Sequence, residues 1–386
     1  MSTEKLWSRD FILGAIINLF ILVNYFVLMV VITDYALTTY KVGAALAGFA
    51  ASVFIVGALF SRFTSSIAMA KFGPRRVLAA GIVAELVLSA LYFIPMALPL
   101  LIALRFVHGF FYGLSSSTVS AIVTSIVPNE RKGEGVGYFM LSTTLGAAIG
   151  PLVGMALSHT LGMQAVFIAC FSTAALNMVA LLGFRPKGVQ APKAAGARGL
   201  RAFIEPSALP ISLVIGVMFF AYSTTLTYLS PFAQQEGLTT AANFFFVAYA
   251  LATFVSRLFT GKLFDRKGPD VVMVPSFVSA AVAFVLIGFA SNDAMLLCGA
   301  MFLGFGVGTI QSCGVTMAVQ QASLDRLSFA NSTAYALMDV GVGIGPVAMG
   351  CVQPLLGYGN LFASMAAMSL VGLAIYLLVS RKRARR

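Results

Sequence analysis

The chain has 386 residues, of which 59% are hydrophobic and only 10% are charged. A soluble domain carries about 25% charged residues, so this composition leaves too little polar surface to coat a globule in water. It suits a lipid bilayer as the solvent. The net charge of +12 allows two partners, nucleic acid or an anionic membrane. The basic residues fall in short runs between apolar segments, so we expect a membrane orientation signal and no nucleic-acid partner.

Apolar segments follow one another along the whole chain. The first, 11–33, is longer than a signal-peptide core and is expected to remain as a helix. Eleven more follow at about 43–65, 76–95, 98–123, 136–158, 162–184, 208–231, 241–264, 271–291, 294–320, 328–353 and 359–380. Each can cross a hydrocarbon core of about 30 Å. We therefore predict an all-α membrane protein with twelve transmembrane helices.

Residues 185–207 interrupt the pattern, because they are rich in Pro, Gly, Ala, Lys and Arg and show no apolar period. We predict a cytoplasmic linker there, between a six-helix half at 1–184 and a second at 208–386. Twelve crossings place both termini on one side. The loops on that side carry nearly all the loop Lys and Arg, and those on the other side carry only Lys41. The positive-inside rule therefore predicts that both termini are cytoplasmic.

The two halves share a repeated pattern. Residues 61–77 and 256–272 match in register at a shift of 195 positions. The same shift aligns Gly109 with Gly304, Gly113 with Gly308, Gly146 with Gly341, and Gly150-Pro151 with Gly345-Pro346. A duplicated half-chain indicates two pseudo-symmetric six-helix bundles.

Cofactor and enzyme signatures are missing from the sequence. Each cysteine lies inside an apolar segment without a CxxC pair, so we expect four small core residues and no disulfide: Cys170, Cys298, Cys313 and Cys351. Two histidines are too few for a histidine metal cluster. No nucleotide loop of the type GxxxxGK[ST], no HExxH and no Ser/His/Asp set occurs. We therefore expect no cofactor, no metal and no enzyme activity.

Three motifs carry a resemblance to a known family. Gly261, Asp265, Arg266 and Gly268 spell G-x-x-x-D-R-x-G. The first-half copy keeps Lys71, Gly73, Arg75 and Arg76, with Ser66 and Ala70 in place of the glycine and the aspartate. Arg105 stands in the sequence RFVHG, and Gly146, Gly150-Pro151 and Gly154 spell G-x-x-x-G-P-x-x-G. These motifs and the twelve apolar segments resemble the major facilitator superfamily over essentially the whole chain. The last motif is similar to the drug/proton antiporter branch, that is, bacterial efflux permeases.

The repeated loop motif predicts a cytoplasmic gate. The Asp265 carboxylate at an inner helix end opposes its own helix dipole, so it should find positive partners such as Arg257, Arg266 or a helix start near 135–137. Such a bond between halves would hold the cytoplasmic side shut. The alternative is a solvated loop carboxylate.

The glycine motif predicts close helix packing. Gly146, Gly150 and Gly154 lie on one helical face, and Pro151 can bend the helix. The second half keeps Gly345 and Pro346. The alternative is generic small-residue packing in a membrane bundle.

Three charged residues lie well inside apolar segments: Glu85, Arg105 and Asp339. A charge at a helix centre costs about 2.5–3.5 kcal/mol, so such residues usually face a cavity or a partner. Asp339 lies near mid-depth, one turn after Tyr335, and we expect it to carry the coupling proton, with Glu85 as the next candidate. The alternatives for Asp339 are a structural ion pair with an arginine and a direct substrate contact.

Polar residues at similar depth are candidates for a substrate cavity. Arg105, His108 and Tyr112 share one helical face. The resemblance implies that helices 1, 4, 7 and 10 line the cavity. The full set is Asn18, Tyr25, Arg105, His108, Tyr112, Tyr222, Thr225, Gln311 and Tyr335. For each of them the alternative is a hydrogen bond between helices.

The resemblance implies a proton-coupled secondary transporter that exports small molecules across the cell inner membrane by rocking of its two halves. The alternatives are an importer or facilitator of a small metabolite and a metallophore exporter. Arg105 and His108 favour anionic or zwitterionic compounds, whereas the many aromatic residues suit lipophilic drugs. The expected partners are a small-molecule substrate, protons and membrane lipids, and the expected state is a monomer.

Overall fold

The computed structural model describes residues 7–128, 131–186, 189, 204–323 and 326–384, and within these ranges it contains helices and no strand. The predicted all-α architecture is confirmed. Most of the predicted linker at 185–207 lies outside the described residues. Contacts between residues divide the chain into two compact units.

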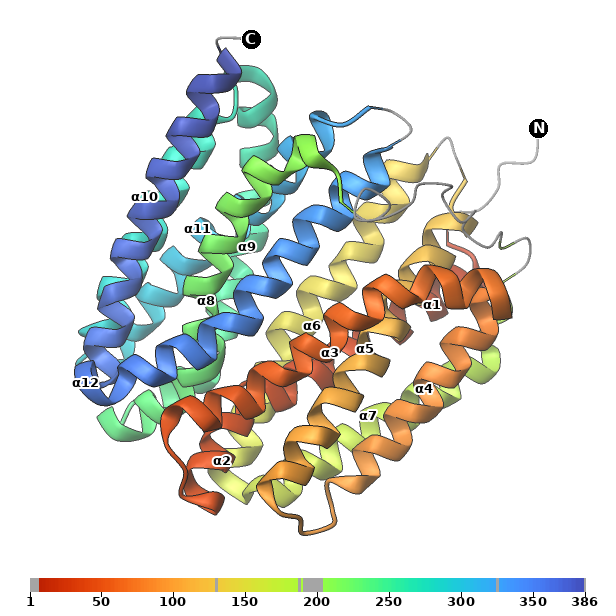
Figure 1. The fold of residues 1–386 in the computed structure, drawn as a ribbon, viewed down its shortest axis with the longest axis horizontal. Coiled ribbons are helices and arrows are strands. Elements are labelled where there is room, and N and C mark those ends of the chain that lie inside the picture. The colour runs from red at the N-terminus through yellow and green to blue at the C-terminus, as the bar shows by residue number, and fades with distance from the viewer. Residues whose placement is uncertain (1–6, 129–130, 187–188, 190–203, 324–325, 385–386) are drawn as a thin grey trace. The chain divides into compact units, whose positions relative to one another are not determined.

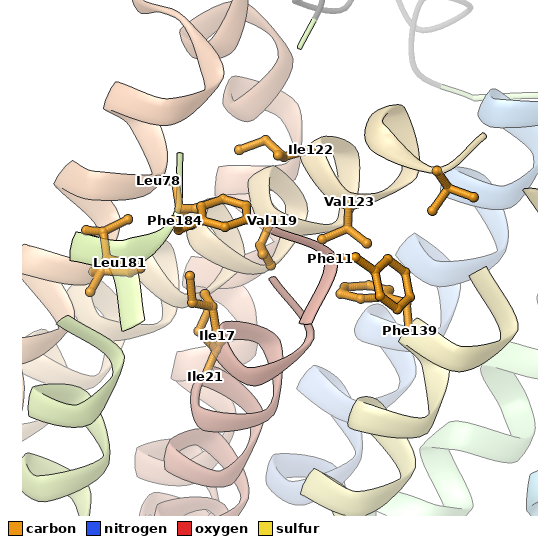
Figure 2. Close-up of a cluster of buried hydrophobic side chains, with 12 residues drawn as sticks. Phe11, Ile17, Ile21, Leu78, Val119, Ile122, Val123, Phe139, Leu181 and Phe184 are labelled. Atoms are coloured by element: carbon orange, nitrogen blue, oxygen red, sulfur yellow. The ribbon is translucent and has the colours of Figure 1, made fainter. Parts of the chain in front are cut away.

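The first unit comprises Met1–Val31 and Val53–Ala195. Its helices are α1 (Arg9–Met29), most of α3 (Ala44–Phe72), α4 (Pro74–Leu91), α5 (Leu98–Ile126), α6 (Lys132–Leu161) and α7 (Met163–Gly183). Figure 2 shows a core in which α1, α4, α5, α6 and the end of α7 meet around Ile17, Val119 and Phe139. Burial of these apolar side chains holds these ends of the helices together.

The second unit comprises Gly196–Arg386 and also Ile32–Ser52. The added segment consists of α2 (Ile32–Tyr40) and the first turns of α3. The remaining elements are a short turn η3 (Pro206–Ala208), α8 (Leu209–Glu236), α9 (Thr239–Lys267), α10 (Asp270–Gly288), α11 (Asp293–Gln320) and α12 (Leu327–Ala384). Figure 1 shows α12 turning back on itself, and Gly357 interrupts it with a φ of 72°. We call residues 327–356 its first arm and 358–384 its second arm.

Ten stretches of the described chain are long and apolar enough to cross a membrane. The difference from the twelve predicted spans has two causes. α12 forms one continuous stretch that holds the last two predicted spans, separated at Gly357. α4 is only 18 residues long and carries Arg75, Arg76 and Glu85, so it is not among the ten.

The repeat inferred from the sequence has a structural counterpart inside each unit. Gly73 and Gly268, which the shift aligns, both end a helix with a positive φ, 84° and 86°. Gly162 and Gly357 are aligned by the same shift and have φ values of 80° and 72°. A left-handed backbone costs little for glycine and more for other residues. The same turn is therefore built at the same place in both halves.

The four cysteines are free thiols. Cys170 and Cys313 are buried, as expected for core residues. The expectation was wrong for Cys298 and Cys351, which are exposed on the surfaces of α11 and α12. An apolar helix has an outer face as well as an inner one, and the sequence does not indicate which face a small residue occupies.

Candidate functional site

An aromatic cluster surrounds Arg105 in the first unit. The Arg105 side chain is 0% exposed, and its guanidinium carbon lies 4.5 Å from the centre of the Phe54 ring. Tyr25 stacks on Phe54 at 5.3 Å and on Tyr112 at 4.9 Å between ring centroids. These rings come from α1, α3 and α5, so three helices meet here. A guanidinium held over an aromatic face keeps a favourable electrostatic contact away from water.

His108 lies one turn after Arg105 on α5 and is also buried. Its Nδ1 is 3.2 Å from the Tyr92 hydroxyl, and its ring packs edge-on against Phe54. The histidine is therefore built into contacts between α3, α5 and the end of α4. Its proposed substrate contact stays a prediction.

Asn18, another predicted cavity residue, connects two helices. Its side-chain amide donates to the Ser142 hydroxyl at 2.8 Å and lies 3.3 Å from the Thr143 hydroxyl, both on α6. Asn18 therefore forms a hydrogen bond between helices, which is the alternative to a role in the substrate cavity. Because the amide is buried, this bond stabilises the α1–α6 contact.

Glu85 lies on the buried face of α4 and is 2% exposed. Its Oε1 makes no hydrogen bond with a described residue. One turn further along α4, Ser89 lies 3.4 Å from the Asn24 amide, which also donates to the Cys170 carbonyl at 2.8 Å. Polar groups from α1, α4 and α7 therefore meet inside the first unit, one helical turn from a buried carboxyl group.

In the second unit the predicted residues lie on α8, α11 and α12. Tyr222 stacks on Tyr249 of α9 at 5.4 Å. Thr225 is fully buried on α8, and its hydroxyl makes no hydrogen bond with a described residue. Gln311 on α11 and the pair Tyr335 and Asp339 on the first arm of α12 are half-buried. The helical spacing places Tyr335 and Asp339 on one face, one turn apart.

The glycine motif of α6 packs directly on α1. A Cβ atom added to Gly146 would lie 2.7 Å from the Leu22 Cβ, and one added to Gly154 would lie 2.5 Å from the Val27 carbonyl oxygen. Gly150 has the same role opposite Phe26, and Pro151 is buried beside it. In the second unit Gly341 and Gly345 face the backbone of α8 in the same way. These glycines are therefore required for close approach of two helices.

The charged loop motifs lie at exposed helix ends. Lys71, Arg75 and Arg76 are exposed, and the two arginines line an open pocket of about 490 Å³ with Phe72. Asp265, Arg266 and Arg257 are exposed on α9. Asp265 makes no hydrogen bond with a described residue, so its proposed gate contact stays a prediction. A Cβ atom on Gly261 would meet open space, so this motif glycine is not required by packing here.

Three residues of these clusters carry no motif and were not predicted from the sequence: Phe54, Tyr92 and Tyr249. The repeat register contained a signal for two of them, because the shift of 195 positions aligns Phe54 with Tyr249. A Cβ atom on Gly109 would clash with the Phe54 carbonyl, and one on the aligned Gly304 would clash with the Tyr249 carbonyl. Among the described residues, no three His, Cys, Asp or Glu side chains come close enough to hold a metal ion.

Comparison with known proteins gives relatives that span most of the chain. The multi-drug resistance efflux pump PmrA of Streptococcus pneumoniae is 24% identical over 330 residues, which cover 82% of this chain and 81% of the pump. The multidrug resistance protein MdtG of Enterobacter lignolyticus is 23% identical over 274 residues, which cover 68% of this chain and 65% of MdtG. These relatives are transporters, so an enzymatic role has no support among them.

Solved structures share the fold. A bacterial homologue of the human lysosomal transporter Spinster, in an inward-facing and unoccupied conformation, has a TM-score of 0.79 at 14% identity and covers 98% of each chain. A POT family transporter in complex with 5-aminolevulinic acid has a TM-score of 0.80 at 15% identity, covering 97% of this chain and 96% of that one. The family model of the Major Facilitator Superfamily matches residues 14–270 and 239–386. With ten membrane-length stretches in the described residues, duplicated motifs and this match, the chain is a multi-pass membrane protein that belongs to the Major Facilitator Superfamily of transporters.

Proposed function

We propose that the chain is a proton-coupled exporter of small molecules in the cytoplasmic membrane, working as a monomer with both termini in the cytoplasm. The observation that best supports export is the glycine face of α6, which packs on α1 through Gly146, Gly150 and Gly154. This motif resembles the antiporter branch, and the relatives PmrA and MdtG are described as multidrug pumps. No observation favours the alternative of a metabolite importer.

The proposed mechanism is alternating access by rocking of two six-helix halves. The glycines leave their own side of each seam without side chains, so the two helices of a pair can approach closely. Asp265 is proposed to hold the cytoplasmic side shut through a partner at another helix end. A charge at a helix terminus contributes about 0.3–2 kcal/mol, which is enough to shift a population without locking it.

Asp339 is proposed to carry the coupling proton. It lies half-buried on the first arm of α12, and Gly341 and Gly345 hold that arm against α8. Protonation would remove a charge from within the membrane-spanning part of the arm. A proton that enters down a membrane potential supplies about 2.3 kcal/mol per 100 mV. Glu85, fully buried on α4, is the second candidate.

The proposed substrate contacts are aromatic. In the first unit, Tyr25 stacks on Phe54 and on the half-buried Tyr112, and in the second unit Tyr222 stacks on Tyr249. A substrate would reach Tyr25 and Tyr222 only after a movement that exposes them, because both are buried here. Arg105 is covered by the Phe54 ring, so it would act on a substrate through its field rather than by direct hydrogen bonding. This arrangement supports planar lipophilic compounds as substrates.

Flux into proteoliposomes under an imposed pH gradient tests the proposal, with a panel of drugs, sugars and metallophores. Wild type should accumulate a lipophilic drug against its gradient. Asp339→Asn should lose this accumulation and keep downhill exchange, while Glu85→Gln should keep both. If only Glu85→Gln loses accumulation, the proton assignment moves to Glu85. If a pH gradient drives no wild-type transport, proton coupling is wrong.

A further inference from the structure

A short segment of the first half of the sequence packs with the second unit. Residues 32–52, which hold α2 and the first turns of α3, belong by their contacts to the same unit as α8 and α12. Peptide bonds join the segment to the first unit at both ends, at 31–32 and 52–53. We call residues 32–52 the crossover segment. Any conformational change that moves it must break contacts inside the second unit.

The Tyr228 hydroxyl stands at the centre of this packing. Tyr228 lies on α8 and is 0% exposed. Its hydroxyl oxygen is 2.5 Å from the Pro346 carbonyl oxygen and 3.1 Å from the Ala44 carbonyl oxygen. A phenol has one proton to donate, so the two carbonyls share it or alternate. One side chain therefore connects the crossover segment, α8 and the first arm of α12.

Small residues from both sides make room for this hydroxyl. A Cβ atom on Gly48 would lie 2.5 Å from the Pro346 carbonyl oxygen and would also clash with the Tyr228 hydroxyl. One on Gly350 would lie 2.5 Å from the Tyr228 hydroxyl and 2.6 Å from the Ala44 carbonyl oxygen. Any side chain at either position would push the backbones apart, so the contact depends on both glycines.

A second polar contact lies near the end of α8. The Gln234 side-chain amide donates to the Asp34 carboxylate at 2.8 Å. It is exposed, so water competes for both groups and its contribution is small. The Tyr228 contact is enclosed, and a buried hydroxyl that loses its acceptor has no water to replace it.

We propose that Tyr228 is a positioning residue of the transport cycle, whose hydroxyl fastens the crossover segment to α8 and α12 in one state and releases it in the other. This rests on the proposed alternating access. On release the hydroxyl is not left without an acceptor, because it keeps the shorter bond to the Pro346 carbonyl when the Ala44 carbonyl leaves. Loss of a single hydrogen bond changes an equilibrium by roughly two- to tenfold.

The distance between spin labels at Lys41 and Gln235 reports whether the crossover segment is packed on α8, and a longer distance means that it is released. Both positions are exposed and lie in the second unit. The measurement uses the purified protein without substrate. Tyr228→Phe should raise the long-distance population about two- to tenfold over wild type. Tyr358→Phe is the matched control. Its ring is 6.1 Å from that of Tyr228, and its hydroxyl makes no hydrogen bond with a described residue. It should leave the distances unchanged.

A second variant distinguishes loss of the Tyr228 contact from misfolding of Tyr228→Phe. Gly48→Ala keeps the Tyr228 hydroxyl but blocks the approach, so it should shift the distances in the same direction. Unchanged distances in both folded variants would overturn the proposal, as would an equal shift in Tyr358→Phe. The distance measurement can be read independently of the transport assay. If the distances shift but no proton-driven flux is found, the proposed function is contradicted and the role of Tyr228 is supported.

Discussion

Arg105 and Phe54 show how a charge is accommodated at the scale of one residue. A charged side chain at a helix centre costs about 2.5–3.5 kcal/mol, and a desolvated cation–π contact returns about 2 kcal/mol. The ring at 4.5 Å therefore offsets much of the cost of burying this guanidinium. The sequence indicated that Arg105 needs a partner, but an aromatic ring on another helix cannot be identified from residue spacing along α5.

Glu205 is a second charged residue whose environment has a measurable consequence. It precedes η3 outside the membrane-spanning segments and accepts hydrogen bonds from Arg326 and from the Ser207 hydroxyl, the latter at 2.7 Å. The bond from Arg326, followed by that from Ser207, lowers the pKa of the Glu205 carboxyl. A lowered folded-state pKa stabilises the fold above the unfolded pKa of about 4.3, and this contribution is lost as the pH falls through the folded pKa.

Glu205→Gln should therefore lower the stability of the detergent-solubilised protein at pH 7 by about 1–2 kcal/mol, because it removes a charged hydrogen bond that is partly open to water. The difference from wild type should shrink as the pH is lowered below about 4.3. Thermal unfolding at a series of pH values measures this, with exposed Glu236→Gln as the control. An equal loss at every pH would show that the carboxylate charge is not responsible.

At the scale of elements, glycines determine how helices pair. The sequence predicted the positions that matter, because glycine is the residue that lets two backbones approach, and aligned positions such as Gly109 and Gly304 make aligned contacts. It did not predict the partners of polar side chains. The bonds of Asn18 to α6 and of Tyr228 to Ala44 depend on how each helix is rotated about its axis, which apolar periodicity leaves open when helices are apolar on every face.

Two glycines of the family motifs should differ in their tolerance of alanine. In Gly154→Ala the new methyl group would lie 2.5 Å from the Val27 carbonyl oxygen, so α6 must move away from α1. In Gly261→Ala it would meet nothing within 4 Å. We expect Gly154→Ala to lower both thermal stability, by about 1–3 kcal/mol, and flux, and Gly261→Ala to change neither. Equal effects of the two substitutions would contradict the packing role of the α6 motif.

At the scale of the whole molecule, composition and repetition predicted the class of protein. The apolar fraction excluded a soluble domain, and the duplicated motifs indicated the family that the comparison established. The spans were harder to delimit, because α4 carries three charged residues and α12 continues through its turn at Gly357. Substrate and direction of transport depend on side-chain contacts that the repeat does not encode.

The orientation of the whole chain in the membrane follows from the distribution of its basic residues. Lys41 lies at the positive-φ turn after α2, and Lys267 ends α9 in the repeated loop motif. Basic residues near helix ends resist translocation, and the predicted loops on the Lys267 side carry almost all of them. The cytoplasmic side should therefore hold Lys267 and the outer side Lys41.

Single cysteines test this orientation in intact cells. Because Cys298 and Cys351 are exposed, all four native cysteines are first replaced by serine or alanine. An impermeant maleimide added outside should label Lys41→Cys before lysis, and should label Lys267→Cys only after the membrane is opened. Labelling of both from one side would refute the predicted spans between them. Labelling of Lys267→Cys alone from outside would mean that the chain is inserted the other way round. Export would then need a different assignment of the gate at Asp265, since this carboxylate lies on the last turns of the same helix as Lys267.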